Sequence, residues 1–264
     1  MWIHQTPAEL RIAAPAKLNL FLEILGKRPD GYHEIETVMA PISCYDWLAF
    51  RPGNDGNLTL TVRGGADDVP TDDRNLVIRA LQCVREWAES KLGKTGLGAR
   101  VWLDKRIPSA AGLGGASSDA AASIIAANRI WNLELSSAEL ISIAARLGSD
   151  IPFFLQSGWA ICTGRGDRVS PIDPLCQLHW VIARPPVGLS TAEVYAACFE
   201  PNNPKKGNEI RESLENGRNV KIGKLLFNRL QGPAAALEPW ISVLERTFEG
   251  TSCLGHQMTG SGSC

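Results

Sequence analysis

The feature that most constrains the fold is a glycine-rich loop in the middle of the chain, followed by a run of small residues. The loop reads RIPSAAGLGGASS over residues 106–118, with glycines at 112, 114 and 115. Glycine lets a backbone turn its N–H groups inward and lets a ligand approach without side-chain collisions. A helix expected to begin at Ser117 adds free N–H groups and the positive end of its dipole, so the loop is a candidate anion-binding site. A flexible connector before a closely packed helix is the alternative that composition leaves open.

The loop matches neither of the standard nucleotide-binding motifs, because Gly-Lys-Ser/Thr does not follow it and its spacing is not GxGxxG. The formal net charge of −1 arises from 27 basic and 28 acidic residues, without the basic stripe that is typical of nucleic-acid binding. No segment approaches the roughly 18 apolar residues needed to span a bilayer, and the seven cysteines form no closely spaced pairs. These features predict a soluble cytoplasmic protein with neither a nucleic-acid nor a membrane partner.

Periodicity predicts a mixed α and β protein. Residues 18–24 alternate, so Lys17 and Asn19 share one face of a strand, with side chains about 7 Å apart. A turn at 27–31 leads into a second strand candidate that contains Tyr32 and His33. Further strands are expected at 47–50, 58–62, 100–105 and 179–185. Helices are expected at 76–91, 117–132, 137–147, 191–199, 221–230 and 239–248.

Four segments together resemble the GHMP small-molecule kinases. IPSAAGLGGASSDAA, from residue 107, is similar to the phosphate-binding motif of that family. APAKLNLFLEILGKRPDGYHEIETVM, LGSDIPFF at 147–154 and MTGSGS at 258–263 resemble, in order and approximate spacing, the branch that phosphorylates a cytidyl-linked sugar alcohol. The likeness runs from about residue 11 to the end. The Lys-Leu-Asn-Leu and Asp-Gly-Tyr-His elements are specific to that branch, whereas the glycine loop alone indicates only the superfamily.

The resemblance implies an α+β, two-domain GHMP kinase fold. Residues 1–163 would form a ribosomal-protein-S5-like N-terminal domain and residues 164–264 an incomplete C-terminal α/β domain, with the active site in the cleft between them. Ala116 stands where the family commonly has glycine, which is tolerated if the residue has an ordinary negative φ. The chain stops at Cys264, where the family continues, so the terminal loop is expected to be poorly ordered.

The implied activity is an ATP-dependent transfer of phosphate to the 2-hydroxyl of 4-diphosphocytidyl-2-C-methyl-D-erythritol, in the non-mevalonate (methylerythritol phosphate) isoprenoid pathway. ATP is then the co-substrate, and Mg²⁺ is expected, although its protein ligands cannot be named. The partner is this small molecule, and the location is the bacterial cytoplasm, or the plastid stroma for a plant protein. Another GHMP kinase, such as homoserine or mevalonate kinase, and a non-catalytic binding protein on the same scaffold are the alternatives.

The resemblance also assigns roles to residues. Asp150 is the expected general base, a role worth roughly 10²–10⁴-fold in rate, and Lys17, whose counterpart lies beside the catalytic carboxylate, keeps it ionised and offsets phosphoryl charge. The phosphates of ATP would be held by Pro108, Ser109, Ala110, Ala111, Gly112, Leu113, Gly114, Gly115, Ala116, Ser117 and Ser118. The substrate would be bound by Asn19, Tyr32, His33, Thr191, Tyr195, Gly260, Ser261 and Gly262.

Each assignment has a plainer alternative. Asp150 can simply cap or hydrogen-bond a turn, and because Pro152 drives the residue before it to extended geometry, the helix ending at Gly148 is not expected to continue. Lys17 can be a solvated charge at a strand edge. The imidazole of His33 suits the edge of a cytosine and the rings of Tyr32 and Tyr195 suit its two faces, yet such residues often serve only in packing.

Overall fold

The computed structural model describes residues 1–65, 69–156 and 158–264. This part of the chain divides into two compact units, each built from several segments. The first unit contains Met1–Ala16, Ile42–Ser109 and Gly114–Ser157, and the second contains Lys17–Pro41, Ala110–Leu113 and Gly158–Cys264. The units are interleaved along the sequence, whereas the sequence analysis divides the chain once, after residue 163. The division into two kinase domains at that residue stays a prediction.

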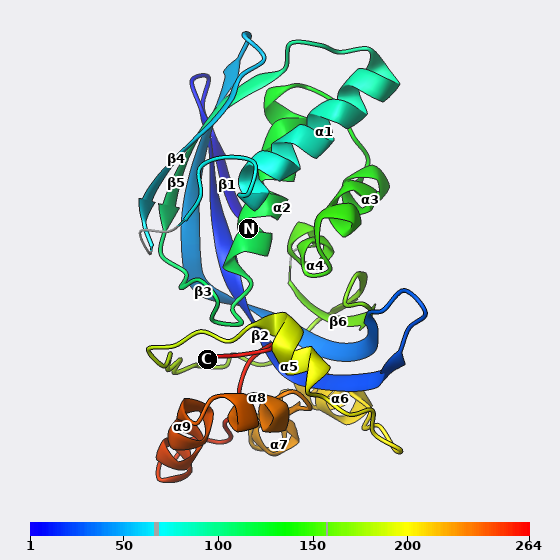
Figure 1. Cartoon of the computed structure of the whole chain (residues 1–264), viewed down its shortest axis with the longest axis vertical. Helices are drawn as coiled ribbons and strands as arrows, with labels where there is room; N and C mark the ends of the chain where they lie inside the picture. The colour runs from blue at the N-terminus through cyan, green and yellow to red at the C-terminus, as the bar shows by residue number, and fades with distance from the viewer. Residues whose placement is uncertain (66–68, 157) are drawn as a thin grey trace. The chain divides into compact units, whose positions relative to one another are not determined.

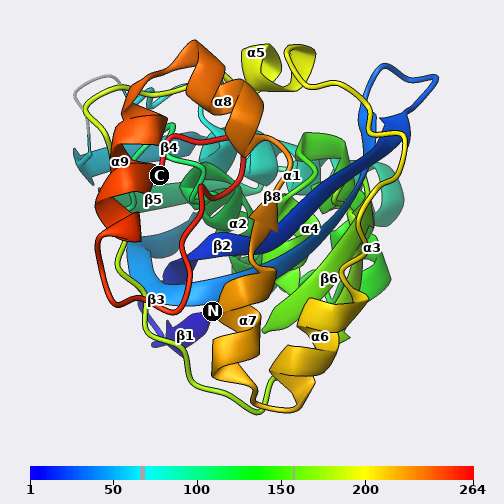
Figure 2. The same cartoon turned by 90° about the horizontal axis from the view of Figure 1, so that it is seen from below.

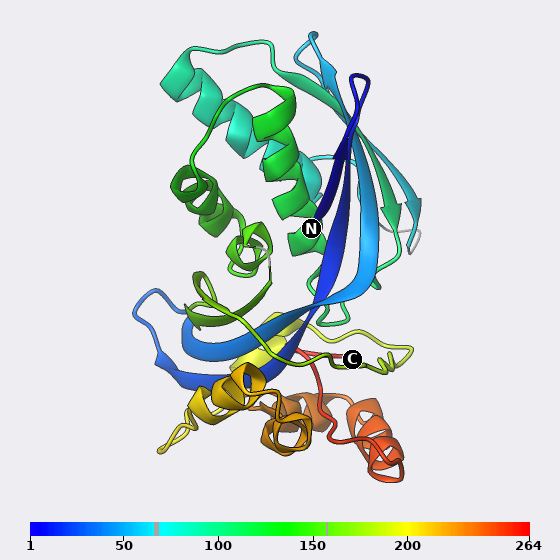
Figure 3. The same ribbon diagram turned by 180° about the vertical axis from the view of Figure 1, so that it is seen from behind.

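The first unit is a sheet with helices on one face (Figure 1). Its strands are ordered β1-β2-β3-β5-β4, with β4 parallel to β5 and β3 antiparallel to β5. The strands are β1 (Trp2–Gln5), β2 (Leu10–Lys27), β3 (His33–Gly53), β4 (Leu58–Gly64) and β5 (Gly98–Lys105). The helices are α1 (Leu76–Leu92), α2 (Gly115–Ile130), α3 (Ser137–Leu147) and α4 (Ile151–Leu155). Figure 3 shows α1 and α2 on one side of these strands, and among the described residues no helix covers the other side.

Local sequence explains where these helices begin and end. The side chain of Asn75 accepts a hydrogen bond from the Val77 N–H at the start of α1, and α1 ends at Gly93 in the left-handed conformation. Ser136 and Glu139 form a capping box at the start of α3. The predicted helices at 76–91 and 137–147 are therefore confirmed. The helix expected at 117–132 is confirmed too, but it begins two residues earlier, at Gly115.

The second unit combines the rest of β2 and β3 with short strands and helices. β6 (Trp159–Gly164) pairs antiparallel with β3 and with β7 (Arg168–Ile172), and β8 (Phe227–Asn228) runs parallel beside β2 (Figure 2). The helices are α5 (Thr191–Ala196), α6 (Asn208–Glu215), α7 (Asn219–Leu225), α8 (Gln231–Leu237) and α9 (Trp240–Glu249). A core cluster joins Leu22 and Ile24 of β2 to Val194, Leu230, Ile241 and Met258. This core anchors the chain end beside β2.

Some predictions about elements are wrong. Residues 179–185 form no strand, and the two strand candidates at 32–42 and 47–50 are parts of one long strand, β3. The helix predicted at 221–230 stops at Leu225, because β8 follows and pairs with β2. Thr259 and Ser263 are buried, so the chain end is packed rather than poorly ordered.

Two broader features of the described residues complete the fold. All seven cysteines are free, although only Cys162 is fully buried. In the part of the chain that the structure describes, every helix is too short or too polar to cross a membrane.

Candidate active site

Lys17 and Asn19 form the centre of a buried polar cluster in the second unit. The Lys17 Nζ donates a hydrogen bond to the Asn19 Oδ1, and each residue is only 4% exposed. The Asn19 Nδ2 donates to the Thr37 Oγ1 at 2.8 Å, and that hydroxyl donates to the Phe21 carbonyl at 2.7 Å. The predicted shared face is confirmed, and the burial of Lys17 excludes a solvated edge charge.

The segment at 258–263 packs directly on this cluster. The Asn19 N–H donates to the Thr259 Oγ1 at 2.9 Å, and a Cβ added to Gly260 would lie 3.1 Å from the Lys17 Nζ. The Asn228 Nδ2, on β8, donates to the Met258 and Gly260 carbonyls at 2.8 Å each. Asn228 therefore holds this segment against β2. The sequence analysis missed Asn228, because a strand of two residues has no periodicity to reveal it.

The central residues of the glycine loop join the same cluster. The Lys17 N–H donates to the Leu113 carbonyl at 2.9 Å, and the Cys264 N–H donates to the Ala111 carbonyl at 3.3 Å. Gly112 has φ +73°, and an added Cβ would collide with the Thr259 carbonyl oxygen. Only glycine permits this close approach. Three segments that are distant in the sequence thus meet within one unit.

The two ends of the loop belong to the first unit. Gly114, with φ +70°, precedes α2, and the Ser118 N–H makes the first turn's hydrogen bond to the Gly114 carbonyl at 2.9 Å. The first N–H groups of a helix lack partners within the helix, so those of residues 115–117 are available to an anion. Ala116 is exposed in this helix and is absent from the positive-φ residues, so its extra methyl is accommodated.

Three charged residues near the loop were missed in the sequence analysis: Asp46, Lys105 and Asp119. All three are buried in the first unit. For Lys105, the alternation of β5 indicates burial in the sequence itself, because Val101, Leu103 and then Lys105 fall on the buried face.

Asp150 lies between α3 and α4 in the first unit. The chain is extended at Gly148, with φ 177° and ψ 154°, and Asp150 resumes a helical conformation. The expectation that Ile151 is extended is wrong, because Pro152 falls in the first turn of α4, where its missing N–H has no cost. The Asp150 side chain makes no capping hydrogen bond at the start of α4. The capping alternative is therefore wrong, whereas a hydrogen bond of Asp150 within the turn stays a prediction.

Aromatic and hydroxyl side chains gather elsewhere in the second unit. The rings of His33 and Tyr195 are 5.3 Å apart between centroids, and the Arg165 guanidinium lies 5.0 Å from the centre of the Tyr32 ring. Tyr32 is 56% exposed. The hydroxyls of Thr191 and Ser261 are hydrogen-bonded at 2.8 Å. The structure thus pairs Tyr195 with His33, and the expected stacking of Tyr32 and Tyr195 on one base stays a prediction.

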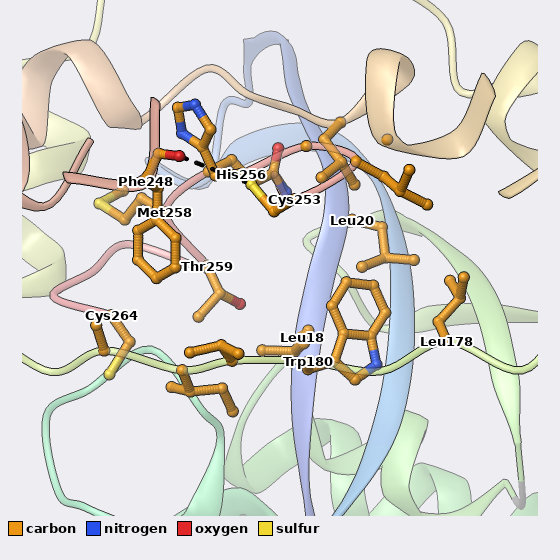
Figure 4. Close-up of a pocket in the computed structure, with 18 of the residues that line it drawn as sticks. Leu18, Leu20, Leu178, Trp180, Phe248, Cys253, His256, Met258, Thr259 and Cys264 are labelled. Carbon is orange, nitrogen blue, oxygen red and sulfur yellow. Dashed lines mark hydrogen bonds between the residues drawn. The ribbon is translucent and has the colours of Figure 1, made fainter. Parts of the chain in front are cut away.

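A cavity of about 630 Å³ lies in the second unit, where Leu18 and Leu20 of β2 line it together with Thr259 and Cys264 (Figure 4). Leu178, Trp180, Phe248 and Met258 add apolar side chains to its wall, and Cys253 and His256 are the other labelled residues. Asn19 and Thr259, which belong to the polar cluster around Lys17, also line this cavity, so the cluster brings polar groups to an otherwise mostly apolar wall.

Comparison with known proteins places the chain among kinases. Residues 75–158 match the model of the GHMP kinases N terminal domain. A 4-diphosphocytidyl-2-C-methyl-D-erythritol kinase of Pelotomaculum thermopropionicum is 42% identical over 94% of this chain and 85% of its own length. One of Protochlamydia amoebophila is 38% identical over 96% and 82%.

Solved structures agree on the fold. The crystal structure of a 4-(cytidine 5'-diphospho)-2C-methyl-D-erythritol kinase is 32% identical, with a TM-score of 0.72, and the match covers 96% of this chain and 87% of that one. A homoserine kinase from Cytophaga hutchinsonii, at 16% identity and a TM-score of 0.69 over 99% and 85%, shares the fold alone. The α+β GHMP kinase fold is therefore confirmed. The chain belongs to the 4-diphosphocytidyl-2-C-methyl-D-erythritol kinases, a family of ATP-dependent small-molecule kinases.

Proposed function

We propose that this chain transfers the γ-phosphoryl group of ATP to the 2-hydroxyl of 4-diphosphocytidyl-2-C-methyl-D-erythritol, giving the 2-phosphate and ADP. The observation that carries the proposal from the family to this chain is the cluster in which Lys17 and Asn19 meet residues 110–113 and 258–264. Catalysis of phosphoryl transfer consists mostly of positioning and charge stabilisation. A buried cation beside part of a phosphate-binding loop supplies both.

We assign proton transfer and charge stabilisation to two residues. Asp150 accepts the proton of the attacking hydroxyl, and Lys17 offsets the negative charge that spreads over the transferring phosphoryl group. The hydrogen bond from Lys17 to Asn19 fixes the direction of the ammonium, and the bond from Asn19 to Thr37 fixes the amide in turn. The charge is therefore held in place before the substrate arrives.

The phosphates of ATP bind, in this proposal, to the loop from Pro108 to Ser118. Its central residues are fixed by the contact of Gly112 with Thr259, and its last residues present the N–H groups that begin α2. Mg²⁺ would accompany ATP and neutralise phosphate charge. The loop offers N–H and hydroxyl groups, and Mg²⁺ often keeps several waters, so phosphate oxygens and water would supply most ligands of that ion.

The cytidyl substrate binds, in this proposal, on the second unit. His33 hydrogen-bonds the edge of the cytosine, and Tyr195 and Tyr32 contact its faces. The contact between His33 and Tyr195 supports a shared role for these two rings. Thr191 and Ser261, whose hydroxyls pair, bind the polar part of the substrate together with Asn19 and the backbone at Gly260 and Gly262.

The proposal is tested by following ATP turnover with and without the cytidyl substrate, using phosphorus NMR to identify the product. The expected result is a phosphomonoester that forms only with the substrate and is lost in Asp150→Asn. Free CMP should compete with the cytidyl substrate, since the site recognises cytosine. Turnover of homoserine or mevalonate that CMP does not inhibit would replace this proposal with another GHMP kinase activity.

A further inference from the structure

A buried cluster of three charged side chains lies in the first unit, and none of them has a role in the mechanism above. The Lys105 Nζ, at the end of β5, donates to the Asp46 Oδ2 at 2.5 Å and to the Asp119 Oδ2 at 2.7 Å. The three side chains are between 0% and 5% exposed. One ammonium thus joins two carboxylates away from bulk water. We call Asp46, Lys105 and Asp119 the loop clamp.

The loop clamp connects the two ends of the phosphate loop. The Asp46 Oδ1 accepts hydrogen bonds from the Arg106 N–H at 2.6 Å and the Ile107 N–H at 2.8 Å, where the chain leaves β5. Asp119 lies in α2, just after the loop. Lys105 bridges the two carboxylates, so the start of the loop and the helix that follows it are held by one side chain.

The two ends also touch directly. A Cβ added to Gly115 would lie 2.9 Å from the Ile107 Cγ2 and 3.0 Å from the Lys105 Nζ. Ile107 is buried, so it has little room to move. The first residue of α2 therefore rests against both the start of the loop and the cation of the loop clamp. A displacement of Lys105 would change the separation of the loop ends.

We propose that Asp46, Lys105 and Asp119 are positioning residues for ATP, which fix the span between residues 106–107 and the N-terminus of α2 and thereby aim the N–H groups that receive the phosphates. The ligand in this inference rests on the proposed function. Donors that are already in place bind an anion without a further cost of ordering. Fold stability alone does not require such a cluster, because apolar residues often replace a buried ion pair without loss.

The charges of the loop clamp indicate which of its two carboxylates an amide can replace. Burial raises the pKa of Asp119 to about 7, Lys105 opposes the shift and Asp46 adds to it. Asp119 is thus the carboxylate that a neutral amide can replace most easily. Asp46 has no such substitute, because its other oxygen serves two backbone donors.

The test compares nucleotide binding in variants of the full chain. Lys105→Met alone would leave two buried carboxylates without a cation. The main probe is therefore the double variant Lys105→Met/Asp119→Asn, which also removes one of these carboxylates. Calorimetry gives the Kd for ADP, and steady-state kinetics give kcat and the KM for each substrate. The expected result is a rise of about 10-fold or more in the Kd for ADP and the KM for ATP, with the KM for the cytidyl substrate within about twofold of wild type.

Two further variants separate positioning from stability. Asp119→Asn alone keeps the pair of Lys105 and Asp46 and an oxygen that can still accept from Lys105, so the rise in its Kd for ADP should be smaller than in the double variant. Val84→Ala, which truncates a buried side chain of α1, should lower stability and leave the Kd for ADP unchanged. A folded double variant with wild-type ADP binding would overturn the proposal, and so would an equal shift in Val84→Ala. If the wild type binds ADP but does not phosphorylate the cytidyl substrate, the proposed function fails, while ADP binding still decides this inference.

Discussion

Gly112 shows how one backbone position couples two motifs of the second unit. Its φ of +73° is in the left-handed region, and its α-carbon faces the Thr259 carbonyl. Gly112→Ala adds both the strain of that conformation and a steric collision, so we expect a loss on the order of 3 kcal/mol in the free energy of unfolding. Urea unfolding measures this loss, and the KM for ATP should rise with it because Thr259 also accepts from Asn19.

Ala110, two residues earlier, provides the matched control. Its φ is +52°, although it is not glycine. Ala110→Gly relieves that strain but raises the conformational entropy of the unfolded chain. The free energy of unfolding should therefore change by between zero and a gain of about 1 kcal/mol. A Gly112→Ala variant that is as stable as Ala110→Gly would show that the contact with Thr259 does not constrain the loop.

At the same scale, the sequence analysis found residues that lie close together in the chain and missed those that do not. Lys17 and Asn19 were placed together because strand alternation fixes the relation of neighbours two residues apart. Lys105 and Asp46 are 59 residues apart, and no local pattern relates them. In the sequence, each of them stands at a position of its strand where alternation predicts a buried residue. This pattern indicates burial but does not identify the partner.

The capping box at the start of α3, the helix that precedes Asp150, should contribute to the stability of the fold. The Ser136 side chain accepts from the Glu139 N–H, and the Glu139 carboxylate accepts from the Ser136 N–H at 2.8 Å. Ser136→Ala removes the first bond and weakens the second, so the free energy of unfolding should fall by about 1 kcal/mol. Ser137→Ala, one residue later, is the control and should be neutral, because Ser137 is exposed at the first position of α3 and alanine is a good helix former. Equal losses in both variants would contradict a specific role for the capping box.

The helices were predicted better than the strands, for a physical reason. Caps such as Asn75, Ser136 and Gly93 are local signals that mark helix ends within a residue or two. A strand also needs a neighbouring strand, and 179–185 pairs with no strand of the described residues, although its apolar residues border the cavity. β8 forms because Phe227 and Asn228 meet β2, and this contact depends on the tertiary fold.

The organisation of the whole molecule was the least predictable from sequence. β2 and β3 each contribute residues to both units, and the phosphate loop is divided between them as well. A single boundary along the sequence cannot describe two units between which the chain passes five times. The resemblance to a kinase family supplied the order of the motifs, whereas the interleaving follows from the length of the two strands.

Two buried carboxylates, Glu23 and Asp119, predict a stability maximum at acidic pH. Burial tends to raise the pKa of Glu23, but hydrogen bonds from Arg229, Lys205 and Ile24 bring it below its ordinary value of 4.5. A lowered pKa contributes stability above 4.5 that is lost as the pH falls through the folded pKa. The effect of Asp119 on stability has the opposite sign, since folding raises its pKa from 3.8 to about 7. Its contribution is complete below 3.8 and is lost as the pH rises towards 7. Stability therefore stops rising near 4.5, where Glu23 is ionised in both states, and already declines above 3.8 because of Asp119, so the two effects together place the maximum at about pH 4.

Urea unfolding of the wild type and Asp119→Asn from pH 4 to pH 8 tests this sign. An asparagine cannot titrate, so the decline of the wild type above pH 5, on the order of 2–4 kcal/mol, should flatten in the variant and its maximum should move to higher pH. Asp104→Asn changes an exposed carboxylate of the same unit and should keep the wild-type decline. If all three proteins lose stability in parallel between pH 5 and pH 8, the charge on Asp119 does not control the decline. The loop clamp would then carry its second negative charge at neutral pH without cost, which means that Lys105 compensates both carboxylates fully.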